Sequence, residues 1–91
     1  MIDLQTYANR IGITISSLKS KDRKMEITTA RQVYWYYLHS NKKGFSEIGR
    51  LFGVNHATVI SGIKRIEGLI EVKDRYIYKY LEAIEYNKNE Q

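Results

Sequence analysis

Apolar residues recur at intervals of three and four along most of the chain, which is the spacing of one face of an α-helix. Between Ile2 and Ile11 this pattern predicts a short first helix, and Gly12 is a suitable C-cap for it. Thr14 or Ser16 could cap a brief helical turn that follows. The chain contains no proline, and the pattern as a whole predicts an all-α fold.

The middle of the chain is rich in aromatic residues. A helix is predicted from about Met25 to Ser40, with an apolar stripe that Trp35 and its neighbours widen. Because two helices can pack on so wide a face, we expect it to be the central core helix, with its aromatic residues used for packing rather than for base stacking. A final helix is predicted from about residue 72 to residue 86, followed by a polar, frayed tail at residues 87–91.

Residues 45–66 combine a short helix, a tight turn and a longer helix. The short helix ends at Gly53, whose freedom at positive φ lets the chain reverse direction. Asn55 then caps the longer helix. A small residue is needed where two such helices cross closely, and Gly49 stands at that position. Together these features predict a helix-turn-helix.

The longer of these two helices, from about residue 55 to residue 70, has two different faces. Val59, Ile63 and Ile66 lie along one face and are predicted to be buried. The other face begins with small polar groups and continues with cations. The residues assigned to this outward face are Asn55, His56, Ala57, Thr58, Ser61, Lys64 and Arg65.

The composition is that of one domain, expected to span residues 1–91 with a core at about residues 2–86 and five to six helices. The chain has 91 residues, of which 43% are apolar and 27% charged, so it can bury a core but cannot hold a catalytic domain plus a binding domain. It has no cysteine, which excludes disulfides and thiolate zinc sites, and the cytoplasm is the expected compartment. Neither a membrane span nor a signal peptide is expected.

Positive charge is concentrated before Leu69. Residues 1–68 hold 11 of the 15 Lys and Arg but only five of the 10 Asp and Glu, whereas residues 69–91 hold four basic and five acidic residues. A polar loop at residues 19–24 carries four of the cations. We therefore expect an anionic partner to meet the first two thirds of the chain.

The outward face of the longer helix suits the major groove of DNA. The amide of Asn55 can form two hydrogen bonds with adenine, and Ala57 and Thr58 can touch the methyl group of thymine. His56 or Ser61 can reach base edges or phosphate, and the two cations further along the helix are expected at phosphate. Sequence-specific binding of double-stranded DNA is therefore the main hypothesis.

Three segments resemble the C-terminal DNA-binding domain of the bacterial replication initiator DnaA. These segments are Arg31-Gln32-Val33, Ser46 to Gly53 and Asn55 to Val59. The likeness extends from about Tyr7 to Leu69, and the stretch from Leu18 to Lys24 resembles the basic loop of that family.

The resemblance implies recognition of the boxes of a replication origin. It implies that Arg23 enters the minor groove beside the box, where narrow A·T-rich DNA has a strongly negative potential. It also implies that Arg31 and Gln32 contact backbone or base edges, that Ser46 lies at a phosphate, and that His56 to Thr58 read the box. The residues expected at DNA are Lys21, Arg23, Lys24, Arg31, Gln32, Ser46, Asn55, His56, Ala57, Thr58, Ser61, Lys64 and Arg65.

The departures from the family pattern fall at the start of the longer helix. The family has an Arg-Asp-His-Thr-Thr run, whereas this chain lacks the Arg and has Asn55 for the acidic residue and Ala57 for the first Thr. The base preference is therefore open. The GxxxxGK[ST] motif of an ATPase is absent. The chain could be part of a longer initiator or a free-standing protein, and Met1 just ahead of the first helix favours the second.

Other chemistry is not indicated. His39 and His56 are seventeen residues apart, without the spacing of a metal-binding motif, so neither a metal nor another cofactor is expected. A nucleophile elbow is absent, and no enzyme activity is expected. No helix combines a cationic face with an exposed apolar one, so a membrane is not an expected partner.

Two alternatives stay open beside the main hypothesis. One is a protein-interaction module on a helix-turn-helix scaffold, with a protein partner at the aromatic C-terminal helix that carries Tyr76, Tyr78, Tyr80 and Tyr86. The other is a transcriptional repressor unrelated to replication. RNA binding fits less well, because the outward helix face suits a wide major groove.

Overall fold

The computed structural model describes residues 1–86, and all regular structure within this range is helical, as predicted. The predicted frayed tail, residues 87–91, lies outside the described residues. The elements are α1 (Leu4–Ile11), α2 (Ile15–Leu18), α3 (Met25–Ser40), α4 (Phe45–Phe52), α5 (His56–Glu71), the 3₁₀-helix η1 (Arg75–Ile77) and α6 (Tyr78–Ala83).

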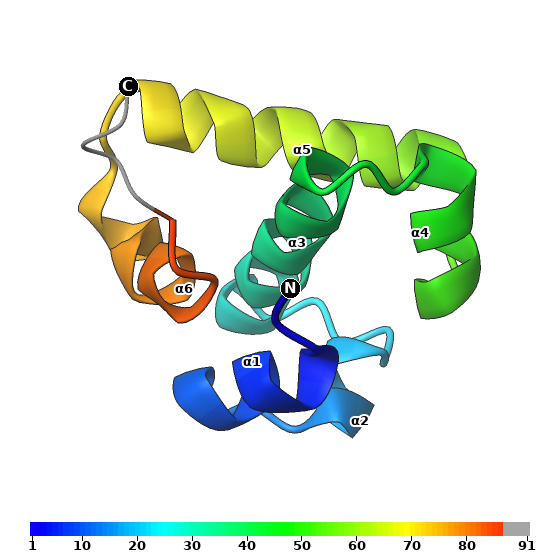
Figure 1. Cartoon of the computed structure of the whole chain (residues 1–91), viewed down its shortest axis with the longest axis horizontal. Helices are drawn as coiled ribbons and strands as arrows, with labels where there is room; N and C mark the ends of the chain where they lie inside the picture. Colours follow the sequence, from blue (N-terminus) through cyan, green and yellow to red (C-terminus); the bar gives the residue numbers. More distant parts are fainter. Residues whose placement is uncertain (87–91) are drawn as a thin grey trace.

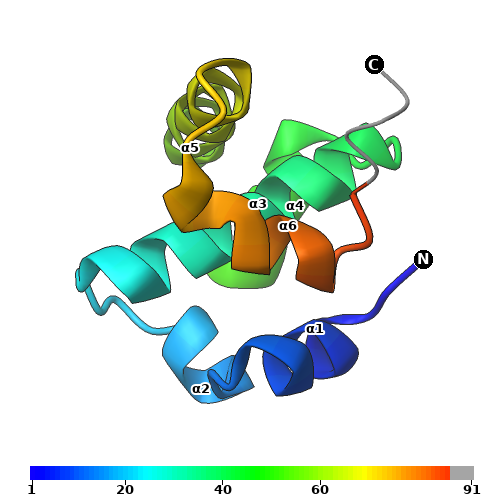
Figure 2. The ribbon, with the colours of Figure 1, turned by 90° about the vertical axis from the view of Figure 1, so that its left-hand side faces the viewer.

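The helices are arranged around α3. In Figure 1, α5 runs along the top of the molecule, α4 lies at the right, α6 at the left, and α1 and α2 below. Figure 2 gives the view from the left and shows α5 and the α1–α2 pair on opposite sides of α3. The α3 helix is therefore the centre of the fold, which confirms the prediction.

Packing on α3 explains its central position. Seven of its sixteen residues are buried. The ring of Tyr34 lies 5.0 Å from that of Tyr7 in α1, measured between centroids, while Trp35 meets Phe52 of α4 edge to face at 5.9 Å. Aromatic pairs at these separations stabilise a core beyond the area they bury. The aromatic residues of α3 thus join helices on two sides, as expected of packing residues.

Polar side chains and glycines mark the helix ends. Asp3 caps α1 by accepting the N–H of Thr6, and Gly12 ends the helix at a φ of 70°. Thr14, rather than Ser16, caps α2 by accepting the N–H of Ser17. These caps satisfy backbone donors that have no partner inside their own helix.

The last helical segment is shorter than the predicted helix from about residue 72 to residue 86, because η1 begins only at Arg75 and runs directly into α6, which ends at Ala83. Lys73 takes a positive φ of 56°, and the carboxylate of Asp74 accepts the N–H of Tyr76 at 2.8 Å to begin η1. The apolar stripe is nevertheless buried, since Ile77 and Leu81 both lie in the core. The pattern identified the buried face but placed the start of the last helix too early, because the left-handed residue ahead of it is Lys73 and not a glycine.

Most of the C-terminal tyrosines pack against the core. Tyr80 is buried, Tyr78 and Tyr86 are partly buried, and Tyr76 is exposed. The exposed aromatic cluster required by the protein-partner alternative is therefore reduced to one tyrosine among these four.

Candidate nucleic-acid interface

The helix-turn-helix of α4 and α5 depends on two glycines, as predicted. Gly53 ends α4 with a φ of 68°. A Cβ atom on Gly49 would lie 2.5 Å from the carbonyl oxygen of Val54, closer than a carbon side chain tolerates. The turn can therefore fold back over α4 only because residue 49 has no side chain.

A third glycine, which the sequence analysis missed, brings α5 close to α3. A Cβ atom on Gly62 would lie 2.8 Å from two ring carbons of Trp35 and 3.0 Å from the side chain of Gln32. The available signal was a glycine inside an otherwise regular helical pattern, which often indicates a close packing contact. This contact places α5 next to Gln32.

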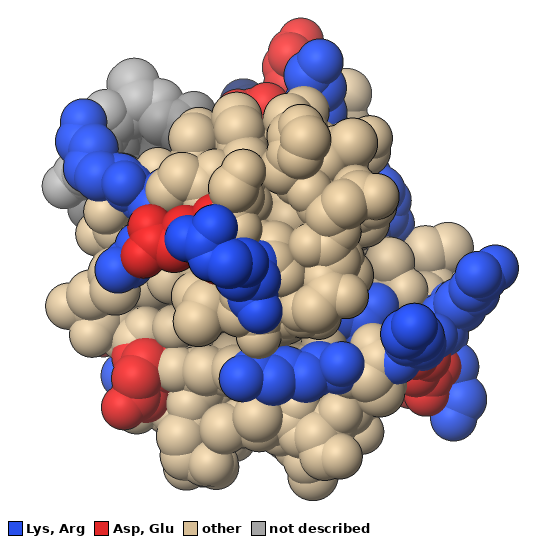
Figure 3. All heavy atoms as spheres, turned by 90° about the vertical axis from the view of Figure 1, so that its right-hand side faces the viewer, with Lys and Arg blue, Asp and Glu red and all other residues tan. Residues whose placement is uncertain are grey.

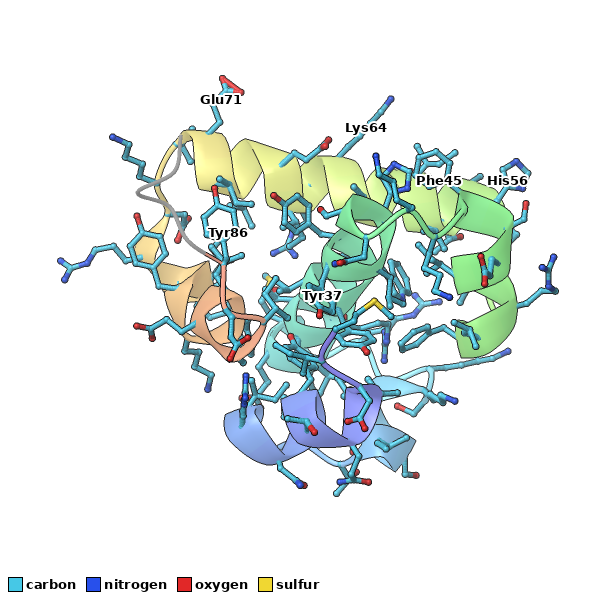
Figure 4. All side chains as sticks on the ribbon, in the orientation of Figure 1. Tyr37, Phe45, His56, Lys64, Glu71 and Tyr86 are labelled. Atoms are coloured by element: carbon cyan, nitrogen blue, oxygen red, sulfur yellow. The ribbon has the colours of Figure 1, made fainter. Side chains whose placement is uncertain are left out.

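The amino end of α5 is open to solvent. His56, Ala57, Thr58 and Ser61 are all exposed, and Figure 4 shows His56 projecting from the end of the helix, away from the body of the molecule. The Oδ1 atom of Asn55 accepts the N–H of Thr58 at 2.9 Å and its hydroxyl at 3.1 Å. Asn55 is thus the predicted helix cap, and a bidentate contact of its amide with adenine would require that cap to open.

A concave surface of about 520 Å³ lies between the loop at residues 19–24, the first half of α3 and the turn before α5. We call it the loop–helix hollow. Its lining residues are Lys19, Ser20, Lys21, Asp22, Arg23, Thr28, Arg31, Gln32, Trp35, Phe52, Gly53, Val54 and Thr58. Two nearly buried aromatic rings contribute to the lining, alongside polar and cationic side chains.

The hollow brings together five of the residues expected at DNA: Lys21, Arg23, Arg31, Gln32 and Thr58. The other expected residues lie outside its lining. These are Lys24, Ser46, Asn55, His56, Ala57, Ser61, Lys64 and Arg65.

Two residues that line the hollow, Lys19 and Thr28, are not among those predicted at DNA. Thr28 could have been found from its spacing, because it lies one helical turn before Arg31 and Gln32 on the same side of α3.

The prediction that Arg65 lies on the outward face of α5 is wrong. Its guanidinium donates to Gln32 Oε1 at 2.7 Å and to Thr29 Oγ1 at 3.1 Å, and also approaches Met25 Sδ at 3.3 Å. Arg65 follows Thr58 by seven residues, which is close to two helical turns, so both point to the α3 side. Lys64 is exposed and points away from α3 in Figure 4.

Arg31 lines the hollow but is also bonded to the loop. Its Nε donates to the carbonyl of Leu18 at 2.7 Å, and its Nη2 donates to that of Ser20 at 2.8 Å. Partial burial lowers the pKa of the Arg31 guanidinium, and the nearby carboxylate of Asp22 opposes this shift.

Asp22 has a structural place in the otherwise basic loop. Its Oδ1 accepts the N–H of Lys24 at 2.9 Å, immediately before α3, and its own N–H donates to Ser20 Oγ at 3.1 Å. Such short-range bonds are typical of turns that contain Asp and Ser. The acidic residue therefore shapes the loop.

The cations that line the hollow take part in neither ion pair of the described residues, and the carboxylate among the lining residues is that of Asp22. Within residues 1–86, ion pairs join Arg10 to Glu85 and Lys43 to Glu47, and neither pair includes a residue that lines the hollow. Figure 3 shows the face that is at the right in Figure 1, where Lys and Arg gather mainly toward the lower right. Because Lys19, Lys21, Arg23 and Arg31 outnumber Asp22 in the lining, the hollow has an excess of positive charge, which attracts anions.

Two further kinds of site are absent from residues 1–86. No helix there is long and apolar enough to cross a membrane. No group of three or more His, Asp or Glu side chains there is arranged to hold a metal ion.

Comparison with known proteins supports the helix-turn-helix. The family "Bacterial dnaA protein helix-turn-helix" matches residues 4–66. The chain is 33% identical over 72 residues to the chromosomal replication initiator protein DnaA of Mycoplasma pneumoniae, which covers 78% of this chain and 16% of that protein. It is 37% identical over 76 residues to DnaA of Thermodesulfovibrio yellowstonii, covering 81% of this chain and 17% of that protein.

The chain thus spans about a sixth of the length of these curated relatives. No solved structure matches it significantly. The family match covers α1 to most of α5 and includes the loop, the turn and the start of α5 that form the hollow. The chain belongs to the bacterial DnaA helix-turn-helix family.

Proposed function

We propose that this domain binds double-stranded DNA in a sequence-dependent way, with the amino end of α5 in the major groove and the loop at residues 19–24 toward the minor groove. The observation that carries the proposal is the loop–helix hollow, since it joins Arg23 of the loop and Thr58 of α5 in one surface. Two segments that are distant in the sequence can therefore contact one duplex.

The shape of the exposed helix end supports this placement. A major groove is about 12 Å wide, and an α-helix with its side chains is about 10–12 Å across. The first exposed residues of α5 are small or of moderate size, so the backbone can approach the base edges. Base reading is assigned to His56, Ala57 and Thr58, and phosphate contacts to Ser46 and Lys64.

The relatives named above are replication initiators. We propose that the DNA sequences bound by this domain are related to the boxes of a replication origin. Binding alone would then be the effect of the domain: it would occupy such boxes, or a promoter that contains one. One exposed tyrosine in the C-terminal part gives less support to a protein partner than the hollow gives to DNA.

Selection of binding sites from random duplexes tests the proposal. The selected duplex is then titrated with the protein at increasing salt. With about four to six phosphate contacts, affinity is expected to fall about 10²- to 10³-fold between about 50 and 200 mM salt, because each contact releases counterions. A protein that binds no duplex at low salt would disprove the proposal.

Two substitutions on α5 distinguish recognition of base edges from contact with phosphate. Lys64→Ala should weaken binding to selected and scrambled duplexes alike and reduce the salt slope by about one. His56→Ala should cost about 1–3 kcal/mol on the selected duplex and little on the scrambled one. Arg75→Ala is the control for net charge, because Arg75 is exposed in η1, away from the hollow. An effect of His56→Ala that is equal on both duplexes, or an effect of Lys64→Ala confined to the selected duplex, would contradict these roles.

A further inference from the structure

We propose that Arg31 is a positioning residue for DNA binding: it holds the loop at residues 19–24 against α3, so that the loop's cations line the hollow. This inference rests on the proposed function and deepens it. The resemblance instead implies that the guanidinium of Arg31 contacts the backbone or base edges of DNA. Positioning needs the shape of the guanidinium.

The contacts of Arg31 converge on one short stretch of backbone. Besides the bonds to Leu18 and Ser20, its Nη2 reaches the carbonyls of Ser17 at 3.4 Å and Asp22 at 3.3 Å. These four carbonyls belong to residues 17–22, at the end of α2 and in the loop. A planar guanidinium with donors in fixed directions can serve several such acceptors at once.

The loop has few other connections. Lys19, Ser20, Lys21, Arg23 and Lys24 are exposed, so their side chains provide no buried anchor. The loop's remaining hydrogen bonds are local and span two to four residues, as from the N–H of Ser20 to the carbonyl of Ser17 at 3.1 Å. Among the hydrogen bonds of the described residues, those of Arg31 connect the loop to the middle of α3.

This arrangement prepares the loop for binding. A mobile loop would have to be ordered when DNA binds, and that entropy cost would reduce affinity. The hydrogen-bond partners of Arg31 are neutral carbonyl oxygens, and the nearby carboxylate of Asp22 is outnumbered by the four cations that line the hollow. The same side chain thus orders the loop and keeps the surface positive.

The variant Arg31→Lys separates the effect of the positive charge of Arg31 from the effect of the shape of its guanidinium. Lysine keeps the positive charge but has one compact ammonium group on a flexible stem, which cannot serve the four carbonyls together. If Arg31 positions the loop, Arg31→Lys and Arg31→Ala should each weaken binding to the selected duplex about tenfold. If Arg31 instead contacts phosphate, Arg31→Lys should keep most of the affinity, which would overturn the proposal.

A double-mutant cycle adds a readout that a general loss of structure does not produce. Arg23→Ala is measured in the unchanged protein and in the Arg31→Lys variant with the same duplex. If Arg31 positions the loop, Arg23→Ala should reduce affinity clearly less in the Arg31→Lys variant than in the unchanged protein, because the loop of the variant is no longer held against α3. Equal costs in the two backgrounds would overturn the proposal.

Hydrogen exchange in the free protein tests, without DNA, whether Arg31 holds the loop in place. The amides of Ser20, Asp22 and Lys24 should exchange several-fold faster in Arg31→Lys, while those within α5 are unchanged. Arg75→Lys should alter neither set. Unchanged exchange in the loop would overturn the proposal that Arg31 positions it. Failure of the unaltered protein to bind any duplex would instead overturn the proposed function and leave the exchange result valid.

Discussion

The two sides of α3 are held by different side chains. Toward α1 the bonds come from tyrosines: the hydroxyl of Tyr7 donates to the carbonyl of Ala30 at 2.6 Å, and that of Tyr34 donates to the carbonyl of Ile2 at 2.8 Å. Toward the hollow they come from Arg31 and Arg65. We call these the tyrosine side and the arginine side.

The difference between the two sides concerns charge. A tyrosine hydroxyl satisfies a backbone carbonyl without adding charge, which suits a surface used for packing. An arginine satisfies several acceptors and stays positive, which suits a surface that attracts phosphate. We therefore expect the structural bonds on the proposed DNA side to contribute to binding as well.

Alkaline pH should produce the largest loss in the free energy of unfolding, and it acts first on the tyrosine side. Burial raises the pKa of Tyr34 and of Tyr80 to about 12, and that of Tyr7 further. A tyrosine in the unfolded chain has a pKa of about 10. The neutral form is thus favoured in the fold, so its stabilisation is complete below about pH 10 and is lost as pH rises toward about 12.

Denaturant unfolding followed by circular dichroism from neutral to strongly alkaline pH measures this loss. Tyr34→Phe is the matched variant, and its unfolding should release about one proton fewer in this range. Tyrosinate absorbance that appears at the usual pH while the protein stays folded would contradict the prediction.

Gly62→Ala should disturb the arginine side, where α5 lies directly on Trp35. The added Cβ would be 2.8 Å from the ring carbons, and we expect a loss of about 1–3 kcal/mol in the free energy of unfolding. Gly68→Ala on the same helix is the control, because nothing lies within 4 Å of the added atom. That control should be stabilising by about 0.5–1 kcal/mol. Thermal unfolding of both variants measures this difference in stability. Similar free energies of unfolding for the two variants would refute the prediction.

Glu85→Gln should have the smallest effect. It removes the ion pair with Arg10, whose atoms are 3.5 Å apart and whose side chains are 40% and 67% exposed. Such exposed pairs contribute little, so the free energy of unfolding should change by less than about 0.5 kcal/mol. Arg10 keeps its bond to the carbonyl of Ala83 at 2.9 Å. A larger loss in urea unfolding would show that carboxylate pairing matters at this end of the molecule.

Local patterns predicted much of the fold and of the candidate site. Gly12 and Gly53 stop helices because glycine takes a left-handed conformation at little cost, and Asn55 starts α5 because its side chain accepts a nearby backbone N–H. The later start of the last helix was missed because Lys73, a residue type that does not favour a left-handed conformation, takes one between α5 and η1. Such a boundary carries no strong local signal in the sequence.

The sequence by itself determined the all-helical class, the helix-turn-helix and the positive charge of the first two thirds of the chain, because these follow from residue types and spacings. Only the tertiary structure decided which cations are bonded within the domain. Arg65 and Lys64 are neighbours in sequence, yet one is bonded to Gln32 and the other is exposed. The reason is geometric: the closeness of α5 to α3 at Gly62 selects which side of α5 meets α3, and spacing along one helix does not specify its partner.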